Sequence, residues 1–249
     1  MNTQLSMDKK SFIRMTGTVY TPPDIAAELT SIVVANLPKK KLNVMEPSVG
    51  DGVFLNQIIS SLYESHFTAV DIDGEVIEKL RSGNSDKTIT FITSDFISHA
   101  LDVLNNTSIR FDLVIGNPPF IRKHNFSYIF KETLSNFSNT IRYPYSDLKN
   151  SWVAFLIGAS RICSDDGIVA FILPYELLTV AYGNKALRSM SEEFECIDIF
   201  IPKNRAFPDI EQDAVIFLGK KKSELRKGLY INHVENLSKL TEPVRSKLN

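Results

Sequence analysis

The sequence predicts an α/β fold in which a mostly parallel sheet is covered by helices on both faces. Short, nearly continuous apolar runs alternate with segments of helical periodicity almost from end to end of the 249 residues. This alternation is typical of parallel strands that are joined by helices. The strands are apolar on both faces, as expected when helices cover the whole sheet. The longest apolar run, residues 152–159, is too short to span a membrane.

The predicted elements follow one another in regular order along the chain. The predicted strands are residues 42–47, 67–73, 88–96, 111–116, 167–174, 195–202 and 214–220. The predicted helices are residues 21–37, 53–66, 74–83, 97–106, 147–163 and 186–194. Thr21 suits the N-cap of the first helix, with Pro22 at its first position, and Asp147 suits the N-cap of the fifth.

Residues 120–146 interrupt this order with a long connection that is rich in aromatic and basic side chains. Loops of this length inside compact domains are typically functional or mobile. The alternative is a helical insertion with a small apolar face of its own, at least in the first half of the segment. The sequence leaves both interpretations open.

Charge and cysteine usage limit the classes of function. The net charge is −1, so any contact with nucleic acid would depend on local basic patches. The lysine runs at 39–41 and 220–222 are interpreted as solvated turns. Cys163 and Cys196 lack metal-ligand spacing and are interpreted as small buried thiols of a reducing compartment. The N-terminus has no apolar signal-peptide core, so a cytoplasmic protein is expected.

The stretch EPSVGDG, residues 46–52, follows the first predicted strand. Gly50 and Gly52 let the backbone turn tightly and approach a ligand, because neither residue carries a Cβ. Ligands of parallel sheets bind beyond the carboxyl ends of the strands. The two glycines therefore mark one wall of a candidate site, although a glycine pair alone would equally make a plain turn.

Acidic side chains stand at the ends of the first three strands. Asp71 is placed to accept hydrogen bonds from ribose hydroxyls, and Asp95 with Phe96 lies beside the same crevice. Together with Glu46, these carboxylates favour a cationic ligand with an uncharged ribose over a polyphosphate. S-adenosylmethionine, which carries a sulfonium and an ammonium, has these properties. NAD is the alternative, but the glycine spacing differs from its fingerprint.

The fourth strand ends in an unusually rigid turn, in the stretch FDLVIGNPPF at residues 111–120. Two prolines fix the backbone between an amide side chain and an aromatic ring. Such a turn holds hydrogen-bonding groups and a ring in one arrangement, which indicates a binding or catalytic loop.

Several of these stretches occur together in a known order. EPSVGDGVFL, VDID, TSDF and NPPF follow GTVYTPP, and in this combination the sequence resembles the amino-methyltransferases that modify DNA adenine at N6, with the motif order of their gamma class. DLKNSWVAFL, DDGIVAFILP and AFPDIE extend the resemblance over residues 12–219. It implies a restriction-modification enzyme with a class I methyltransferase (Rossmann-like) fold, whose seven-stranded sheet has an antiparallel last strand.

The resemblance also implies a cofactor site for S-adenosylmethionine. Thr21 and Glu46 would meet its methionine moiety, Asp71 its ribose, and Asp95 with Phe96 its adenine. The predicted cofactor-binding residues are Thr21, Glu46, Pro47, Ser48, Gly50, Gly52, Asp71, Ile72, Asp95, Phe96 and Asn117. For Glu46 a capping carboxylate is the structural alternative, and for Phe96 a core aromatic.

The catalytic residues implied by the resemblance are Asn117, Pro118, Pro119 and Phe120. An exocyclic base amine is a poor nucleophile because its lone pair is delocalised into the ring. The side-chain oxygen of Asn117 and the carbonyl of Pro118 can accept its N–H groups and free that lone pair, and the prolines preorganise both acceptors. No His, Cys or metal is needed, because the methyl donor is already activated.

An adenine in duplex DNA must be flipped out to reach such a site, which costs a few kcal/mol. Stacking on Phe120 and on Phe207 in AFPDIE would offset this cost, at ~1–3 kcal/mol per base. For Phe207, packing in the last hairpin is the alternative. Arg122 and Lys123 are placed to contact phosphates.

Other substrates and roles remain open. Enzymes that methylate glutamine in release factors or guanine in ribosomal RNA also carry NPP with an aromatic residue, but lack the upstream TPP element as it stands here. Cytosine N4 enzymes usually begin the motif with Ser. A non-catalytic subunit that binds only cofactor or DNA is disfavoured by the intact Asn117 and Asp71.

Residues 220–249 are predicted to form a tail that is too short to fold alone, since chains below ~40 residues rarely do so. Family members that read a DNA sequence carry a recognition region after the catalytic domain. We therefore expect a fragment of a longer enzyme, or a catalytic subunit that acts on DNA with a separate target-recognition region or subunit.

Overall fold

The computed structural model describes residues 21–37, 41–62, 64–85, 88–203, 213–238, 240 and 244–247. Its strands are β1 Asn43–Glu46, β2 His66–Asp71, β3 Ile89–Thr93, β4 Phe111–Gly116, β5 Cys163–Pro174, β6 Cys196–Pro202, β7 Ala214–Lys220, β8 Gly228–Val234 and β9 Val244–Lys247. Its helices are α2 Pro23–Asn36, α3 Val53–Ile59, α4 Gly74–Gly83, α5 Phe96–Asn106, α6 Tyr128–Ile141, α7 Ser151–Ile162, α8 Glu176–Thr179 and α9 Ala181–Glu193, with 3-10 turns η1 Lys123–Asn125 and η2 Tyr145–Asp147.

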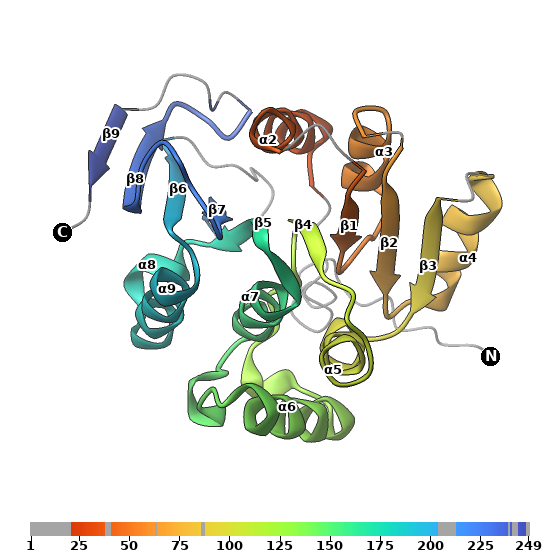
Figure 1. Cartoon of the computed structure of the whole chain (residues 1–249). Coiled ribbons are helices and arrows are strands. Elements are labelled where there is room, and N and C mark those ends of the chain that lie inside the picture. The colour runs from red at the N-terminus through yellow and green to blue at the C-terminus, as the bar shows by residue number, and fades with distance from the viewer. Residues whose placement is uncertain are drawn as a thin grey trace, which may run out of the picture.

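The strands form one sheet in the order β3-β2-β1-β4-β5-β7-β6-β8-β9 (Figure 1). The five strands from β3 to β5 are parallel neighbours, whereas β7 runs antiparallel to both β5 and β6. The chain moves outward from β1 to β3 and then returns to the other side of β1 as β4. This reversal creates a switch point between β1 and β4, where α/β sheets bind their ligands.

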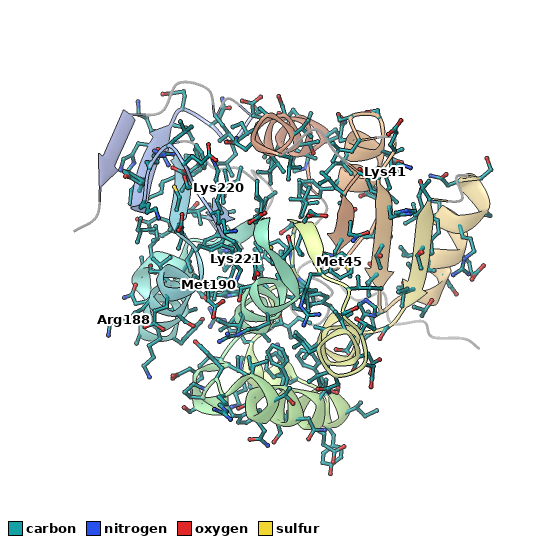
Figure 2. The ribbon with its side chains drawn as sticks, in the orientation of Figure 1. Lys41, Met45, Arg188, Met190, Lys220 and Lys221 are labelled. Carbon is teal, nitrogen blue, oxygen red and sulfur yellow. The ribbon has the colours of Figure 1, made fainter. Side chains whose placement is uncertain are left out.

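Two helical layers cover the sheet (Figure 1). Leu29 of α2, Phe54 of α3 and Ile77 of α4 are buried in the core on one face. The larger core on the other face contains residues of α5, α7 and α9. Met45 of β1 and Met190 of α9, both labelled in Figure 2, belong to this core. The predicted mostly parallel sheet with helices on both faces is confirmed.

The prediction of seven strands is wrong, because β8 and β9 follow the antiparallel strand β7 within the described residues. Strand β8 lies parallel to β6, and β9 pairs antiparallel with β8. The sheet therefore continues beyond Lys220. In β8 the apolar pattern is interrupted by Asn232 and His233, and it is too weak to indicate a strand.

A buried polar network supports the pairing of β8 with β6. Asp198 of β6 is 2% exposed, and its carboxylate accepts hydrogen bonds from Arg226 and, at 2.9 Å, from the side chain of Asn232. Hydrophobic periodicity does not reveal such a network, because its members are polar. This is the physical reason why the apolar pattern of the sequence predicts no strand after β7.

Residues 120–146 form a helical insertion rather than an open loop. Helix α6 begins after Ser127, whose side chain accepts the N–H of Phe130 at 3.1 Å. Leu134 and Phe137 are fully buried against the larger core. The helix ends at Ile141 and is followed by Arg142, which has a positive φ of 55°. The helical interpretation is thus correct, although α6 spans the middle of the segment rather than its first half.

Two predicted helix caps are wrong. Helix α2 has Pro22 at its N-cap position and starts at Pro23, so Thr21 precedes the cap. Helix α7 starts at Ser151, and Asp147 belongs to η2, where it pairs with Lys185 at 2.8 Å. In both cases, a polar side chain suited to capping makes a tertiary contact instead.

The interpretation of residues 220–222 as a solvated turn is wrong for Lys221. Its side chain is 13% exposed and pairs with Glu193 at 2.7 Å. Its neighbour Lys220 donates to the side chain of Asn36 at 2.6 Å; both lysines are labelled in Figure 2.

None of the helices in the described part of the chain combines the length and apolarity that a bilayer span requires.

The polar network under β8 can be tested by changing Arg226. Arg226→Met leaves the carboxylate of Asp198 buried without its cation, so the free energy of unfolding should fall by roughly 2–4 kcal/mol. Lys203→Met is the matched control, because it removes only the exposed ion pair with Glu235 and should cost less than about 0.5 kcal/mol. Urea denaturation measures both, and equal losses would contradict a structural role for the network.

Candidate active site

A cavity of about 450 Å³ opens at the carboxyl ends of β1, β2 and β4. It brings together most of the predicted site: Thr21, Glu46, Pro47, Ser48, Gly50, Asp71, Ile72, Asp95, Phe96, Asn117 and Pro119 line it. Gly52, Pro118, Phe120, Arg122 and Lys123 are not among its lining residues, and Phe207 lies outside the described residues. The cavity lies at the switch point of the sheet, as predicted for its ligand.

The loop after β1 is shaped by its two glycines. Gly50 and Gly52 have φ angles of 49° and 79°, in the left-handed region that favours glycine. At Gly52 an added Cβ would also lie 2.9 Å from a side-chain carbon of Leu80. Gly52 therefore supports the turn into α3, whereas Gly50 contributes to the cavity wall directly.

Asp71 has a structural role besides its position in the cavity. Its Oδ2 accepts the N–H of Gly50 at 2.8 Å, and its Oδ1 accepts the N–H of Asp73 at 3.0 Å. The carboxylate thus joins the end of β2 to the loop after β1. Each carboxylate oxygen can accept a second hydrogen bond, so Asp71 is still able to receive ligand hydroxyls.

The end of β3 supplies an acid and a ring. Asp95 caps α5, because its Oδ1 accepts the N–H groups of Ile97 and Ser98 at 3.0 and 3.1 Å. Its Oδ2 is the oxygen that remains for a ligand. Phe96 is 1% exposed and packs against Phe155 with ring centroids 4.9 Å apart. Both rings line the cavity, so Phe96 is a core residue and a wall residue at once.

Glu46 is the most perturbed acid in the cavity. Its side chain is buried, and within the described structure its Oε2 has no hydrogen-bond partner. Burial raises the pKa of Glu46 well above its usual range; the N–H of Leu55 opposes this shift, and the nearby Asp51 and Asp71 add to it. A buried carboxyl with an unused oxygen, among other acids, is suited to receive a cation.

Asn117 is held from two sides. Its Nδ2 donates to Thr21 Oγ1 at 3.2 Å, and its backbone carbonyl accepts the hydroxyl of Ser48 at 3.1 Å. With Nδ2 bound to Thr21, Oδ1 occupies the opposite side of the amide group. Three segments that are distant in sequence thus meet at the end of β4.

Ser151 fixes the backbone of the NPPF loop and was not predicted. Its hydroxyl donates to the carbonyl of Pro119 and accepts the N–H of Ile121 at 2.9 Å, and its own N–H donates to the carbonyl of Ile121 at 2.9 Å. Ser151 is 1% exposed and lines the cavity. A serine at a helix start carries no sequence signal beyond capping, so only the structure shows this role.

The two predicted phosphate contacts lie on the surface beside the NPPF loop. Arg122 pairs with Glu176 at 3.1 Å while its side chain stays 65% exposed. The ammonium of Lys123 lies 3.7 Å above the ring of Tyr145. Burial, followed by the nearby Lys149 and Lys131, lowers the pKa of Lys123. Phe120 is half-buried against the larger core, and its stacking role remains a prediction.

The insertion forms one wall of the cavity, which the sequence did not predict. Residues on both sides of the start of α6 line the cavity: Asn125, Phe126, Ser127, Ile129, Phe130 and Thr133. Their apolar spacing indicated a helix but not the element against which it would pack.

This sheet order, with a ligand cavity at the carboxyl ends of β1 and β4, defines the class I S-adenosylmethionine-dependent methyltransferase fold. A Listeria monocytogenes protein described as a member of that class matches with a TM-score of 0.67 at 18% identity, covering 90% of this chain and 68% of that one. The model of the Eco57I restriction-modification methylase family matches residues 26–207. The chain belongs to that family, which confirms the restriction-modification methylase family predicted from the motifs.

The chain matches only part of the length of its curated relatives, as two of them show. The type II methyltransferase M.AccI of Acinetobacter calcoaceticus is 24% identical over 235 residues, which are 92% of this chain and 42% of that protein. M.HincII of Haemophilus influenzae is 28% identical over 214 residues, 85% of this chain and 38% of that protein. The chain therefore spans about two fifths of the length of these curated relatives.

The raised pKa of Glu46 predicts a pH-dependent effect of Glu46→Gln on the ligand-free protein. Above its usual pKa of 4.5, the unfolded chain loses this proton before the folded protein does, so the wild type loses stability as pH rises through that window. Gln cannot ionise, so the variant should become more stable relative to wild type as pH rises, by about 1.4 kcal/mol per unit of pKa difference.

Urea denaturation from about pH 5 to about pH 8 measures this difference. Glu192→Gln on the exposed face of α9 is the control for the loss of a glutamate at the surface. A Glu46→Gln difference that stays constant over the range would show that burial does not perturb this carboxyl.

Proposed function

We propose that this chain is the catalytic region of a DNA methyltransferase that transfers a methyl group from S-adenosylmethionine to N6 of an adenine flipped out of duplex DNA. The observation that carries this proposal is the position of Asn117. Thr21 holds its side-chain amide and Ser48 its backbone carbonyl, at the edge of an acid-lined cavity. The methyl donor and the acceptor amine can therefore meet at one point.

The cavity suits S-adenosylmethionine in charge and in size. Glu46 would receive the ammonium group, because its buried Oε2 lacks a partner among the described residues. A bound cation would lower the pKa of Glu46 and favour its charged form. Asp71 would accept the ribose hydroxyls, and Asp95 Oδ2 the adenine amino group, beside the wall of Phe96. When bound, the sulfonium supplies a methyl group that needs no further activation.

The groups that act on the base amine belong to the NPPF loop. Asn117 Oδ1 and the carbonyl of Pro118 would accept the two N–H groups of the adenine amine, which localises its lone pair for in-line attack. The acceptors need little reorganisation during the reaction, because Thr21 fixes the amide and Ser151 fixes the backbone after Pro119. Preorganised acceptors of this kind stabilise the transition state more than the ground state.

Contacts to DNA would lie around the mouth of the cavity. The exposed Arg122 and the cluster of Lys123, Lys131 and Lys149 form a local basic surface in a chain of net charge −1, and such a surface can bind phosphates. Phe120 and Phe207 are proposed to stack on the extruded adenine. The relatives are more than twice as long as the match, so we propose that a further region or subunit reads the DNA sequence.

Family membership favours DNA over glutamine or ribosomal RNA as the substrate. Asn117 at the first position of the motif favours adenine over cytosine. The test is to incubate the chain with DNA and labelled S-adenosylmethionine and then to identify the methylated nucleosides by mass spectrometry. N6-methyladenine is expected, and N4-methylcytosine alone, or label only in protein or RNA, would overturn the proposal.

Asn117→Ala should reduce methyl transfer by about 10²–10³-fold, as loss of one preorganised hydrogen-bonding group does in other enzymes. Affinity for S-adenosylmethionine should change much less, because the interaction acts mainly in the transition state. Single-turnover transfer and calorimetry provide the two measurements. Asn136→Ala on the exposed side of α6 is the control, and an Asn117→Ala enzyme with wild-type turnover would exclude this mechanism.

A further inference from the structure

Helix α6 presents a short apolar strip to the cavity. Ile129 and Thr133 lie one helical turn apart, and both line the cavity together with Phe130. The next turns of the helix are anchored in the core through Leu134 and Phe137, each 0% exposed. The strip is therefore carried by a helix whose position is fixed by packing.

Two large aliphatic side chains line this cavity and yet remain exposed. Ile129 on α6 and Ile72 after β2 are each 75% exposed. Ile129 belongs to the insertion, and Ile72 directly follows the carboxyl end of β2. Exposed aliphatic groups that line a cavity gain free energy when a ligand with an apolar face buries them.

The packing of α6 indicates which end of the cavity this strip covers. Helix α6 packs against α5, which begins at Phe96. An added Cβ at Gly158 of α7 would lie 3.2 Å from Phe96 and 3.5 Å from Phe137, so α6 adjoins the buried ring beside Asp95. Asn117 is held instead by Thr21 and Ser48. Helix α6, which carries the strip, therefore packs against the helix that begins at Phe96, the ring beside which adenine is proposed to bind.

Phe130, the residue after Ile129, packs against another aromatic ring. Phe130 meets Phe126 edge to face, with ring centroids 5.0 Å apart, and Ser127 caps the same turn by accepting the N–H of Phe130. The first turn of α6 is therefore held in place, so little side-chain or backbone entropy would be lost when a ligand binds.

We propose that Ile129 is a cofactor-binding residue that, with Ile72, closes over the adenine ring of S-adenosylmethionine. The insertion between the NPPF loop and α7 then contributes to cofactor binding as well as to the proposed phosphate contacts. This inference rests on the proposed placement of S-adenosylmethionine in the cavity.

The test is the affinity of Ile129→Ala for two probes, S-adenosylhomocysteine and 5′-methylthioadenosine, measured by calorimetry without DNA. The variant should lose about tenfold in affinity for both probes, because both contain the adenine ring whose apolar contact is removed. Ile129→Leu should restore most of the affinity. Tyr128→Ala is the matched control, because Tyr128 is 73% exposed on the same turn but is not a lining residue.

Glu46→Gln separates failure of the inference from failure of the placement. If the cofactor lies as proposed, Glu46→Gln weakens S-adenosylhomocysteine but not methylthioadenosine, which lacks the amino-acid end. If Glu46→Gln weakens S-adenosylhomocysteine as expected but Ile129→Ala binds both probes like the wild type, the role of Ile129 is overturned and the placement of the cofactor is not. Unchanged affinity in both variants would overturn the placement. Equal losses in Ile129→Ala and Tyr128→Ala would show a general effect on α6 and would also overturn the inference.

Discussion

The geometry of the active site depends on how the loop after β4 is held. Thr21 accepts the amide of Asn117, Ser48 donates to its carbonyl, and Ser151 binds the backbone on both sides of Phe120. These contacts come from the segment before α2, the loop after β1 and the start of α7. Because the two prolines already restrict the backbone, the added contacts leave the loop essentially one conformation. In the proposed reaction, the acceptors for the base amine would therefore be in place before DNA binds.

The same region brings acidic side chains together where the sheet ends. Glu46 and Asp71 are the last residues of β1 and β2, Asp95 follows β3, and neighbouring parallel strands bring their carboxyl ends to one edge. Two of these acids also stabilise the fold, since Asp71 holds the N–H of Gly50 and Asp95 caps α5. Glu46 differs, because it is buried with one oxygen unpartnered within the described structure. Binding of a cationic cofactor would relieve this cost, which links cofactor affinity to the stability of the site.

The sequence was sufficient where a feature depends on local pattern. Apolar strands predicted β1 to β7, helical periodicity predicted α2 to α5, α7 and α9, and strand ends located Glu46, Asp71, Asp95 and Asn117 on one cavity. It was insufficient where a feature depends on tertiary packing. Strand β8 is held by the buried Asp198 network, and Ser151, Phe155 and Ile129 become wall residues only because α7 and α6 pack beside the cavity. Thr21 matched a helix cap in sequence but binds Asn117 in space.

A crystal structure of the chain with S-adenosylhomocysteine tests the central claim most directly. We expect the amino group of the ligand at Glu46, the ribose hydroxyls at Asp71, and the adenine at Asp95, with the sulfur facing Asn117. A ligand bound outside this cavity, or bound within it with its adenine at Glu46, would overturn the proposed cofactor site.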